Sequence, residues 1–411
     1  MYGFMLSALS SNSGKTVLSS GIVRALSERA PIVPFKCGPD YVDPLLLSHA
    51  ARTPAYNLDS VLSGDDGLRE IFSRSGDRAI VEGVMGFFDG LDPVTFEGSS
   101  YHIAKILQLP VVLILNAQGM AATVAAQVLG VQSVAKDVKI AGVILNRVSS
   151  VRHEEILKSA VKAHTDIDIL GAVPTLDDLA VPSRKTGLIT PDEAFFEYAG
   201  GVVKRYVDID RLSALSIDNF WIADQVRNDV DSPVVYIAYD EAFCFYYQST
   251  FDLLEANGYT IKRFSPLRNE TVEGADLIYL GGGYPELHLD RLSKATQTKE
   301  SILAHYRAGR KVFGEGGGFL YMTRSIDSYP TLGIFEADSV SSSRRRLGYV
   351  QTTLGKGHIY SYAELINVNE SYFGEATRLS SGEVYKDGFM KNAAYGGFSS
   401  FMFNRCIDEI W

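Results

Sequence analysis

Short apolar runs alternate with helical segments through the first 190 residues of the chain. The runs contain few polar positions and read FMLSAL, PIVPFK, AIVEGVMGFF, PVVLILNAQ, KIAGVILNR and DILGAVP, with the helical segment VLSSGIVRALSERA after the first of them. Strands with so few polar positions are typical of a parallel sheet that is covered by helices on both faces. The pattern therefore predicts a doubly wound α/β domain over residues 1–190.

The alternation stops after residue 190 and starts again near residue 232. Residues 191–231 contain helix-compatible stretches but no strand-like run, so we interpret them as a connecting element. The renewed pattern reads PVVYIAYD, TIKRFSP, ADLIYLGGG and KVFGEGGGFLYM, with helices near TFDLLEANG and SILAHYRAG and irregular β-like segments in LGYVQTTL, EVYKDGF and GGFSSFMF. It predicts a second α/β domain over residues 232–411.

Composition and charge exclude several classes of protein. The 411 residues carry a net charge of −10, which opposes binding to a phosphate backbone, and they contain no apolar run near the 18 residues of a membrane span. The N-terminal segment has no signal-peptide pattern, and the odd number of cysteines (Cys37, Cys244 and Cys406) suits a reducing compartment. We expect a cytoplasmic protein without nucleic-acid or membrane partners. Residues 344–346, three arginines, form either solvated surface or a contact for an anionic substrate.

A candidate phosphate-binding loop follows the first strand. It consists of Ser10, Ser11, Asn12, Ser13, Gly14, Lys15 and Thr16. Backbone N–H groups at the start of the next helix would face phosphate oxygens, Lys15 would add a positive charge, and the Thr16 hydroxyl would bind Mg²⁺. Leu9 stands where the usual pattern has its first glycine, and Asn12 is a residue that tolerates a left-handed turn. The alternative is an ordinary serine-rich helix cap.

Acidic residues follow two later strands, in GPDYVDP and VEGVMGFFDG. In a doubly wound sheet these loops lie beside the phosphate loop at the carboxyl ends of the strands, so Asp40, Glu82 and Asp89 can converge on one Mg·ATP. A magnesium ion prefers oxygen ligands, which Thr16, Asp40 and Glu82 would supply. The alternative is that Asp40 and Asp43 only shape a proline-flanked turn.

At this point the chain resembles the cobyrinic acid a,c-diamide synthases. The matching stretches are ALSSNSGKT, PFKCGPDYVDP, YNLDS, VEGVMGFFDG, VILNRVSSVRHEE, LGAVPTLDDLAVPSR, YDEAFCFYY, FSPL and YLGGGYPELHLDRL. The resemblance implies a P-loop domain similar to dethiobiotin synthetase, followed by a class I glutamine amidotransferase-like domain. It also implies that ATP and Mg²⁺ activate a tetrapyrrole carboxylate as an acyl phosphate, which ammonia then converts to an amide. Lys15, Asp40, Glu82 and Asp89 would be the catalytic residues.

Departures from the family pattern bear on the substrate and on the nitrogen source. Asn116 replaces a usual aspartate, and Lys185 and Thr186 replace a His-Leu pair. In the second domain, Gly316 occupies the place of the nucleophilic cysteine, and Ser400 aligns with the histidine that would act as base. The loop that would supply oxyanion donors, residues 281–286, is retained. A glutaminase needs both a thiol and a base, so we expect glutamine hydrolysis to be absent.

These observations favour an ATP-dependent carboxylate–amine ligase that uses ammonia or another amine. The alternative is a nucleotide-binding pseudoenzyme, or a regulatory partner of an active synthase. Candidate partners are a small-molecule carboxylate, an ammonia-supplying protein and a second copy of the chain in a homodimer. A copurifying chromophore would identify the substrate class.

Overall fold

The computed structural model describes residues 2–74, 77–176, 191–215 and 233–403. The chain divides into two compact units, residues 1–223 and 224–411. Each unit has its own sheet and its own buried apolar core. Among the described residues, no helix combines the length and the apolar character needed to cross a membrane.

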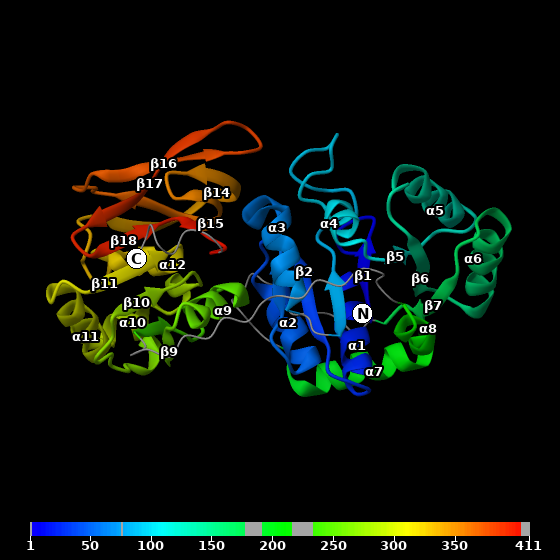
Figure 1. The fold of residues 1–411 in the computed structure, drawn as a ribbon, viewed down its shortest axis with the longest axis horizontal. Coiled ribbons are helices and arrows are strands. Elements are labelled where there is room, and N and C mark those ends of the chain that lie inside the picture. The colour runs from blue at the N-terminus through cyan, green and yellow to red at the C-terminus, as the bar shows by residue number, and fades with distance from the viewer. Residues whose placement is uncertain (1, 75–76, 177–190, 216–232, 404–411) are drawn as a thin grey trace. The chain divides into compact units, whose positions relative to one another are not determined.

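The first unit is built on a parallel sheet with the strand order β3-β2-β4-β1-β5-β6-β7 (Figure 1). Its strands are β1 (Tyr2–Ala8), β2 (Val33–Cys37), β3 (Tyr56–Leu58), β4 (Arg78–Glu82), β5 (Val111–Asn116), β6 (Ile140–Val148) and β7 (Ile169–Pro174). Its helices are α1 (Lys15–Ser27), α2 (Val42–Ala51), α3 (Ser60–Ser73), α4 (Ser100–Leu107), α5 (Thr123–Val134), α6 (Val151–His164), α7 (Glu193–Tyr206) and α8 (Ile209–Ser213).

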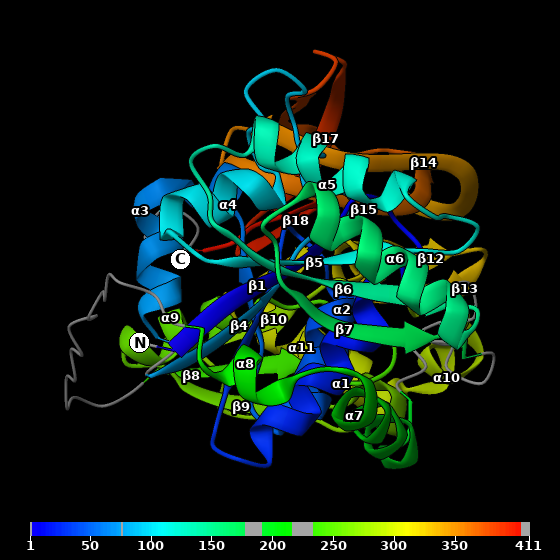
Figure 2. The same cartoon turned by 90° about the vertical axis from the view of Figure 1, so that its right-hand side faces the viewer.

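Helices cover both faces of this sheet. Figure 2 shows α5 and α6 on one side of β6 and β7, and α1 and α7 on the other. Helices α1, α2 and α7 pack against one another, as do α5 and α6. This two-sided cover explains why the strands are apolar throughout, and it confirms the doubly wound α/β fold class predicted from the sequence.

Helices α7 and α8 come from the segment interpreted as a connecting element, and they lie in the first unit. At Gly21 and Gly200 a Cβ atom would come within 3 Å of the facing helix, so the two glycines permit the close packing of α1 on α7. Arg24 is 1% exposed and donates hydrogen bonds to Glu193 Oε2 (3.1 Å) and to His49 O (3.0 Å). A buried guanidinium therefore joins α1 to both α2 and α7.

The second unit has a mixed sheet in which β9-β8-β10-β11 run parallel and lead into an antiparallel region (Figure 1). Its strands are β8 (Val234–Ala238), β9 (Thr260–Phe264), β10 (Leu277–Leu280), β11 (Lys311–Glu315), β12 (Ser325–Ile326), β13 (Tyr329–Pro330), β14 (Asp338–Thr352), β15 (Gly355–Ile366), β16 (Tyr372–Arg378), β17 (Val384–Lys391), β18 (Ala394–Gly397) and β19 (Ser399–Ser400). Its helices are α9 (Gln248–Ala256), α10 (Leu289–Lys294), α11 (Thr296–Arg307) and α12 (Gly317–Met322), with short 3₁₀ turns at Pro266–Arg268 and Pro285–Leu287.

The β-like segments predicted near the C-terminus are strands of this antiparallel region. The longest of them, β14 and β15, form a hairpin whose register shifts between Ser341 and Arg346. The three arginines lie at this irregularity, where Arg344 pairs with Glu383 (3.2 Å) and Arg346 lies over the ring of Phe398 (5.0 Å). The first interaction joins the hairpin to the residue before β17, and the second joins it to the residue between β18 and β19.

Candidate active site

Three adjacent strands of the first sheet end at the phosphate loop. The strand order β2-β4-β1 places their carboxyl ends side by side, although the strands are far apart in sequence. In the register of β2 on β4, Lys36 is the neighbour of Glu82, and in that of β4 on β1, Glu82 is the neighbour of Leu6. The side chains at these strand ends therefore gather beside the loop that follows β1.

The loop between β1 and α1 has a backbone suited to binding phosphate. Gly14 has a φ of 82° and Asn12 a φ of 63°, so both lie in the left-handed region. A Cβ atom on Gly14 would lie 2.3 Å from Asn146 Nδ2, and that same amide donates a hydrogen bond of 2.8 Å to Ser13 O. Asn146, at the end of β6, therefore holds the loop open at the N-terminus of α1, where backbone N–H groups attract anions.

The serines of the loop have different environments. Ser13 is buried and donates a hydrogen bond to Ser10 O (2.8 Å), whereas Ser10, Ser11 and Asn12 are exposed at the outer side of the turn. Ser13 thus stabilises the turn from inside. The exposed residues leave the outer side of the loop accessible.

Lys15 is buried at the start of α1. Its ammonium donates a hydrogen bond of 2.7 Å to the carbonyl oxygen of Met85, in the loop after β4. Burial and the nearby charge of Lys36, against the attraction of Glu82, together lower the pKa of Lys15 to about 8. The acceptor of this hydrogen bond is a neutral carbonyl group, and a bound phosphate would place a negative charge beside the ammonium.

A buried ion cluster lies at the ends of β2 and β4. Lys36 Nζ is 2.6 Å from Glu82 Oε1, 2.7 Å from Asp43 Oδ2 and 3.1 Å from the carbonyl oxygen of Gly83. Thr16 also donates to Glu82 Oε1, at 3.2 Å. Burial opposes the charge of Lys36, but the carboxylates of Asp43 and Glu82 outweigh it and raise the pKa of Lys36. Burial, reinforced by the charge of Asp43, raises the pKa of Glu82.

The structure thus brings Lys15, Thr16 and Glu82 together and assigns Asp40 and Asp89 other contacts. Asp40 Oδ1 accepts hydrogen bonds from the backbone N–H groups of Val42 (2.8 Å) and Asp43 (2.9 Å), so it caps the start of α2. Asp89 Oδ2 accepts from the N–H of Gly86 at 2.9 Å and shapes the loop after β4. A metal-binding role for Asp40 and a catalytic role for Asp89 stay predictions.

Lys36 and Asp43 are site residues that the sequence analysis missed as such. Asp43 appeared there only as a turn-shaping residue, yet it is 5% exposed and lies against the same ammonium as Glu82. The sequence did contain a signal for this arrangement. Lys36 and Glu82 each stand at the last or next-to-last position of their apolar strand, where a charge faces a ligand rather than the core.

The donor atoms of this cluster fit a magnesium ion. Glu82 Oε2 is buried and has no hydrogen-bond partner among the described residues, which leaves one carboxylate oxygen unsatisfied. A hydroxyl and two carboxylates are the hard oxygen ligands that Mg²⁺ prefers. No set of three acidic, histidine or cysteine side chains in the described ranges is close enough to hold a metal without other ligands. Phosphate oxygens and water would have to complete the coordination.

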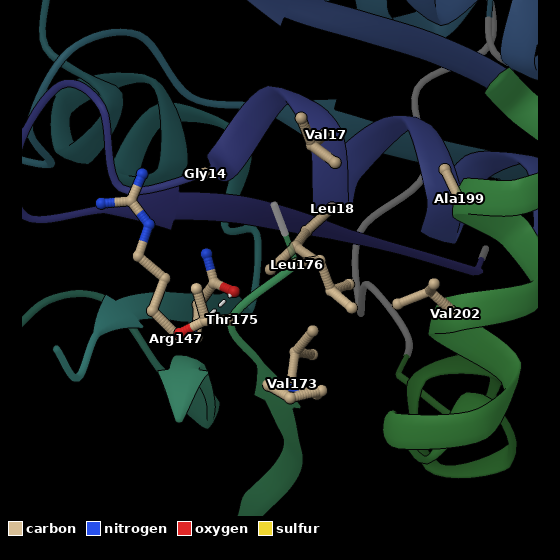
Figure 3. A pocket seen from close by; sticks show the side chains of 11 residues that line it. Gly14, Val17, Leu18, Arg147, Val173, Thr175, Leu176, Ala199 and Val202 are labelled. Carbon is tan, nitrogen blue, oxygen red and sulfur yellow. Dashed lines mark hydrogen bonds between the residues drawn. The ribbon is translucent and has the colours of Figure 1, made fainter. Parts of the chain in front are cut away.

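A pocket of about 520 Å³, which includes space open to solvent, is lined in part by Gly14 of the phosphate loop (Figure 3). Its walls come from the start of α1, the ends of β6 and β7, and one face of α7. The lining residues are Gly14, Val17, Leu18, Asn146, Arg147, Val173, Pro174, Thr175, Leu176, Ala199 and Val202. Figure 3 shows Leu18, Val173 and Val202 directed toward the same space, whereas Arg147 extends on the side of Gly14. Apolar walls beside a phosphate loop suit a flat heterocyclic base.

In the second unit, Gly316 forms a sharp turn between β11 and α12. Its φ of 49° and ψ of −112° are strained for any residue with a side chain. A Cβ atom on Gly316 would meet nothing closer than Gly282 Cα (3.7 Å) and Ser400 Oγ (4.0 Å). The turn therefore has the form of a nucleophile elbow with space for a side chain, and Ser400 Oγ borders that space.

The surroundings of this elbow are well ordered by buried hydrogen bonds. Glu315 accepts hydrogen bonds from the hydroxyl of Tyr279 (2.7 Å) and from the N–H of Phe401 (2.9 Å), which ties β19 to β11. Burial raises the pKa of Glu315 to about 8. Beside the elbow lies a pocket that includes Gly283, Glu286 and Tyr360, and burial raises the pKa of Glu286 to about 7.

The other residues that the sequence singled out lie apart from these contacts or outside the described residues. Cys37 and Cys244 are buried and free of disulfides, and burial raises the pKa of each thiol to about 12. Asn116 Oδ1 accepts a hydrogen bond from the N–H of Gln118 at 3.2 Å. The Lys185–Thr186 pair and Cys406 lie outside the described residues.

Comparison with known proteins assigns a class to each unit. Residues 4–188 match the CobQ/CobB/MinD/ParA nucleotide binding domain, and residues 234–377 match the CobB/CobQ-like glutamine amidotransferase domain. The chain therefore combines a nucleotide-binding domain with a glutamine amidotransferase-like domain, as the sequence and the fold had indicated.

Relatives that match along almost the whole chain identify the family. A cobyrinate a,c-diamide synthase of Saccharolobus solfataricus is 35% identical and covers 98% of each chain. A cobyrinate a,c-diamide synthase of Methanococcus maripaludis is 36% identical over 92% of this chain and 91% of its own. One of Listeria monocytogenes is 34% identical over 97% and 95%. This chain belongs to the cobyrinate a,c-diamide synthase family, which confirms the resemblance found in its sequence.

Proposed function

We propose that this protein uses ATP to amidate a carboxylate of a cobyrinic acid-type tetrapyrrole, with ammonia or another amine as the nitrogen source. The family supports the substrate class, because the relatives are named cobyrinate a,c-diamide synthases. One observation supports a nitrogen source other than glutamine. At the elbow of the second unit, Gly316 and Ser400 stand in place of a thiol and a base.

The phosphate loop and the ion cluster support ATP as the activating substrate. In this proposal the N–H groups at the start of α1 and the ammonium of Lys15 bind the phosphates, and the base occupies the pocket beside Gly14. Thr16, Glu82 and Asp43 would hold Mg²⁺ together with phosphate oxygens, and the ion would neutralise charge on the transferring phosphoryl group. Asp40 remains a candidate ligand through its place at the start of α2.

The chemistry requires activation because a carboxylate is a poor electrophile at neutral pH. Transfer of the terminal phosphoryl group to a carboxylate oxygen releases ADP and forms an acyl phosphate. Ammonia then attacks the carbonyl carbon, phosphate leaves, and the amide forms. Lys15 would offset the negative charge that accumulates during the transfer, which is the usual role of a cation at such a site.

The second unit supports a nitrogen source other than its own glutamine hydrolysis. Attack on the glutamine amide needs a nucleophile at the elbow, and glycine has no side chain to supply one. Ser400 has a hydroxyl in the position of the base, and a hydroxyl is far too weakly basic to take a proton from a thiol at neutral pH. The intact elbow backbone then serves to preserve the fold of this unit.

The test is an amidation assay on the full chain with cobyrinic acid, ATP and Mg²⁺. We expect ammonium chloride to support formation of ADP and of an amide seen by mass spectrometry, and we expect glutamine to support neither. Release of glutamate from glutamine would refute the proposal that the protein does not hydrolyse glutamine. Binding of ATP without formation of ADP in the presence of the carboxylate and ammonium would refute the ligase and favour a regulatory, nucleotide-binding protein.

A further inference from the structure

The ammonium of Lys36 occupies the carboxylate oxygens that a divalent cation would need. It lies 2.6 Å from Glu82 Oε1 and 2.7 Å from Asp43 Oδ2, and the three side chains are between 1% and 6% exposed. Two cations cannot share the same lone pairs at these distances, because their charges would repel each other in a site with little water. A metal ion therefore gains Glu82 Oε1 and Asp43 Oδ2 as ligands only if Lys36 moves away.

We propose that Lys36 is a built-in counter-ion shared by Glu82 and Asp43 in the nucleotide-free protein, and that a divalent cation displaces it when it binds. This inference rests on the proposed function for the identity of the metal site. The register of β2 on β4 fixes Lys36 beside Glu82 whatever the ligand state, so the ammonium competes at a high local concentration.

The arrangement of hydrogen bonds agrees with an exchangeable partner. Glu82 Oε1 accepts from both Lys36 and Thr16, whereas Oε2 of the same carboxylate has no partner among the described residues. A purely structural ion pair would normally satisfy both oxygens of a carboxylate that is 1% exposed. Glu82 Oε2 can therefore bind an incoming cation before the ammonium leaves Oε1.

Lys36 also has a partner that is not a carboxylate. Nζ donates a hydrogen bond of 3.1 Å to the carbonyl oxygen of Gly83, at the start of the loop after β4, and can keep it when the carboxylates are released. A lysine side chain has four rotatable bonds, so the ammonium can leave the carboxylates while its stem stays in place. Displacement therefore needs no change in the strands.

The experiment compares Mn²⁺ binding to the full-length wild type and to Lys36→Met without nucleotide, measured from the electron paramagnetic resonance signal of free Mn²⁺. Removal of the competing ammonium should raise the affinity on the order of tenfold, within the usual range of coupling between two binding events. Mn²⁺ should also raise the melting temperature of Lys36→Met more than that of the wild type, because in the variant the ion replaces the positive charge that was removed.

The matched control is Lys15→Met. Lys15 is a neighbouring buried lysine, but it donates to Met85 O rather than to the carboxylates, so its removal should change the Mn²⁺ affinity much less. Equal affinities in the wild type and Lys36→Met, or equal gains in the two variants, would overturn the proposal. A Lys36→Met protein that stays unfolded even with Mn²⁺ would also overturn it, because the ion should replace the lost counter-ion.

The Mn²⁺-binding experiment and the amidation assay can fail independently of each other. A wild type that forms amide from ammonium, together with an unchanged Mn²⁺ affinity in Lys36→Met, would refute only the counter-ion role. Tighter Mn²⁺ binding in Lys36→Met, together with a wild type that forms no ADP, would refute the ligase activity and leave the counter-ion role intact.

Discussion

Replacement of Glu315 by glutamine should stabilise the second unit, increasingly so as the pH rises. Glu315 is fully buried among neutral partners, the Tyr279 hydroxyl and the Phe401 N–H, and burial raises its pKa from 4.5 to about 8. The folded protein therefore holds this proton up to a pH of about 8, whereas the unfolded chain releases it near 4.5. Between these values unfolding releases a proton, so a rising pH favours unfolding.

The magnitude follows from the difference between the two pKa values. Each pH unit between 4.5 and 8 lowers the free energy of unfolding by about 1.4 kcal/mol, and the whole interval amounts to about 5 kcal/mol as an upper bound. A glutamine side chain has the same shape and does not ionise. Its oxygen can accept from Phe401 and its amino group can donate to Tyr279, so the variant should lose this pH dependence and keep the tie between β19 and β11.

Hydrogen–deuterium exchange of peptides that cover β11 measures this quantity in the second unit alone. The protection of Glu315→Gln relative to wild type should grow by roughly tenfold per pH unit between pH 5 and 8, and comparison at equal pH cancels the intrinsic exchange rate. Glu300→Gln, a substitution at an exposed position of α11, is the matched control and should show no such trend. A constant difference between Glu315→Gln and wild type at all pH values would show that Glu315 is ionised in the folded protein.

Three further variants test the two sites. Lys15→Ala should lower kcat/KM for ATP by about 10²–10³-fold with an unchanged melting temperature, because it removes a cation at the phosphates; a change below twofold would contradict the site. Gly316→Cys should release no glutamate from glutamine, because Ser400 offers no base, and glutamate detected by a coupled dehydrogenase assay would contradict this. Asp43→Asn should abolish ADP formation while a nucleotide analogue still binds, and full turnover would exclude Asp43 from the metal site.

The convergence of the phosphate loop with the loops after β2 and β4 could be predicted from the sequence because it follows from topology. Apolar strands that alternate with helices fix a parallel sheet, and the carboxyl ends of neighbouring strands meet at one edge. Lys15 and Thr16 come from the phosphate loop and Glu82 from the end of β4, and the structure brings them together as this reasoning requires. The turn at Gly316 was expected from the resemblance to the family, which places the nucleophile's position there, and the glycine at this position accepts the positive φ.

The partners of individual charged groups could not be predicted. Whether Asp40 or Asp43 faces Glu82 depends on the residue at which α2 begins, and the helix begins at Val42, so Asp40 caps it while Asp43 turns toward Lys36. Sequence patterns place a helix boundary to within a few residues at best, and one residue of a helix corresponds to a rotation of about 100°. The counter-ion role of Lys36 depends on the register of β2 on β4, which apolar runs leave open.

The contact of the buried Arg24 guanidinium with Glu193 sets a lower limit on the length of a fragment that could bind nucleotide. The pocket beside Gly14 takes one wall, Ala199 and Val202, from α7, which follows the rest of the P-loop fold in sequence. A truncated protein that ends at residue 190, where the apolar alternation ends, would lose that wall and leave Arg24 without its carboxylate. The first unit of this chain therefore needs α7, and Ile209 and Leu212 of α8 belong to the same apolar core, so fragments for ligand screening should end no earlier than Leu215.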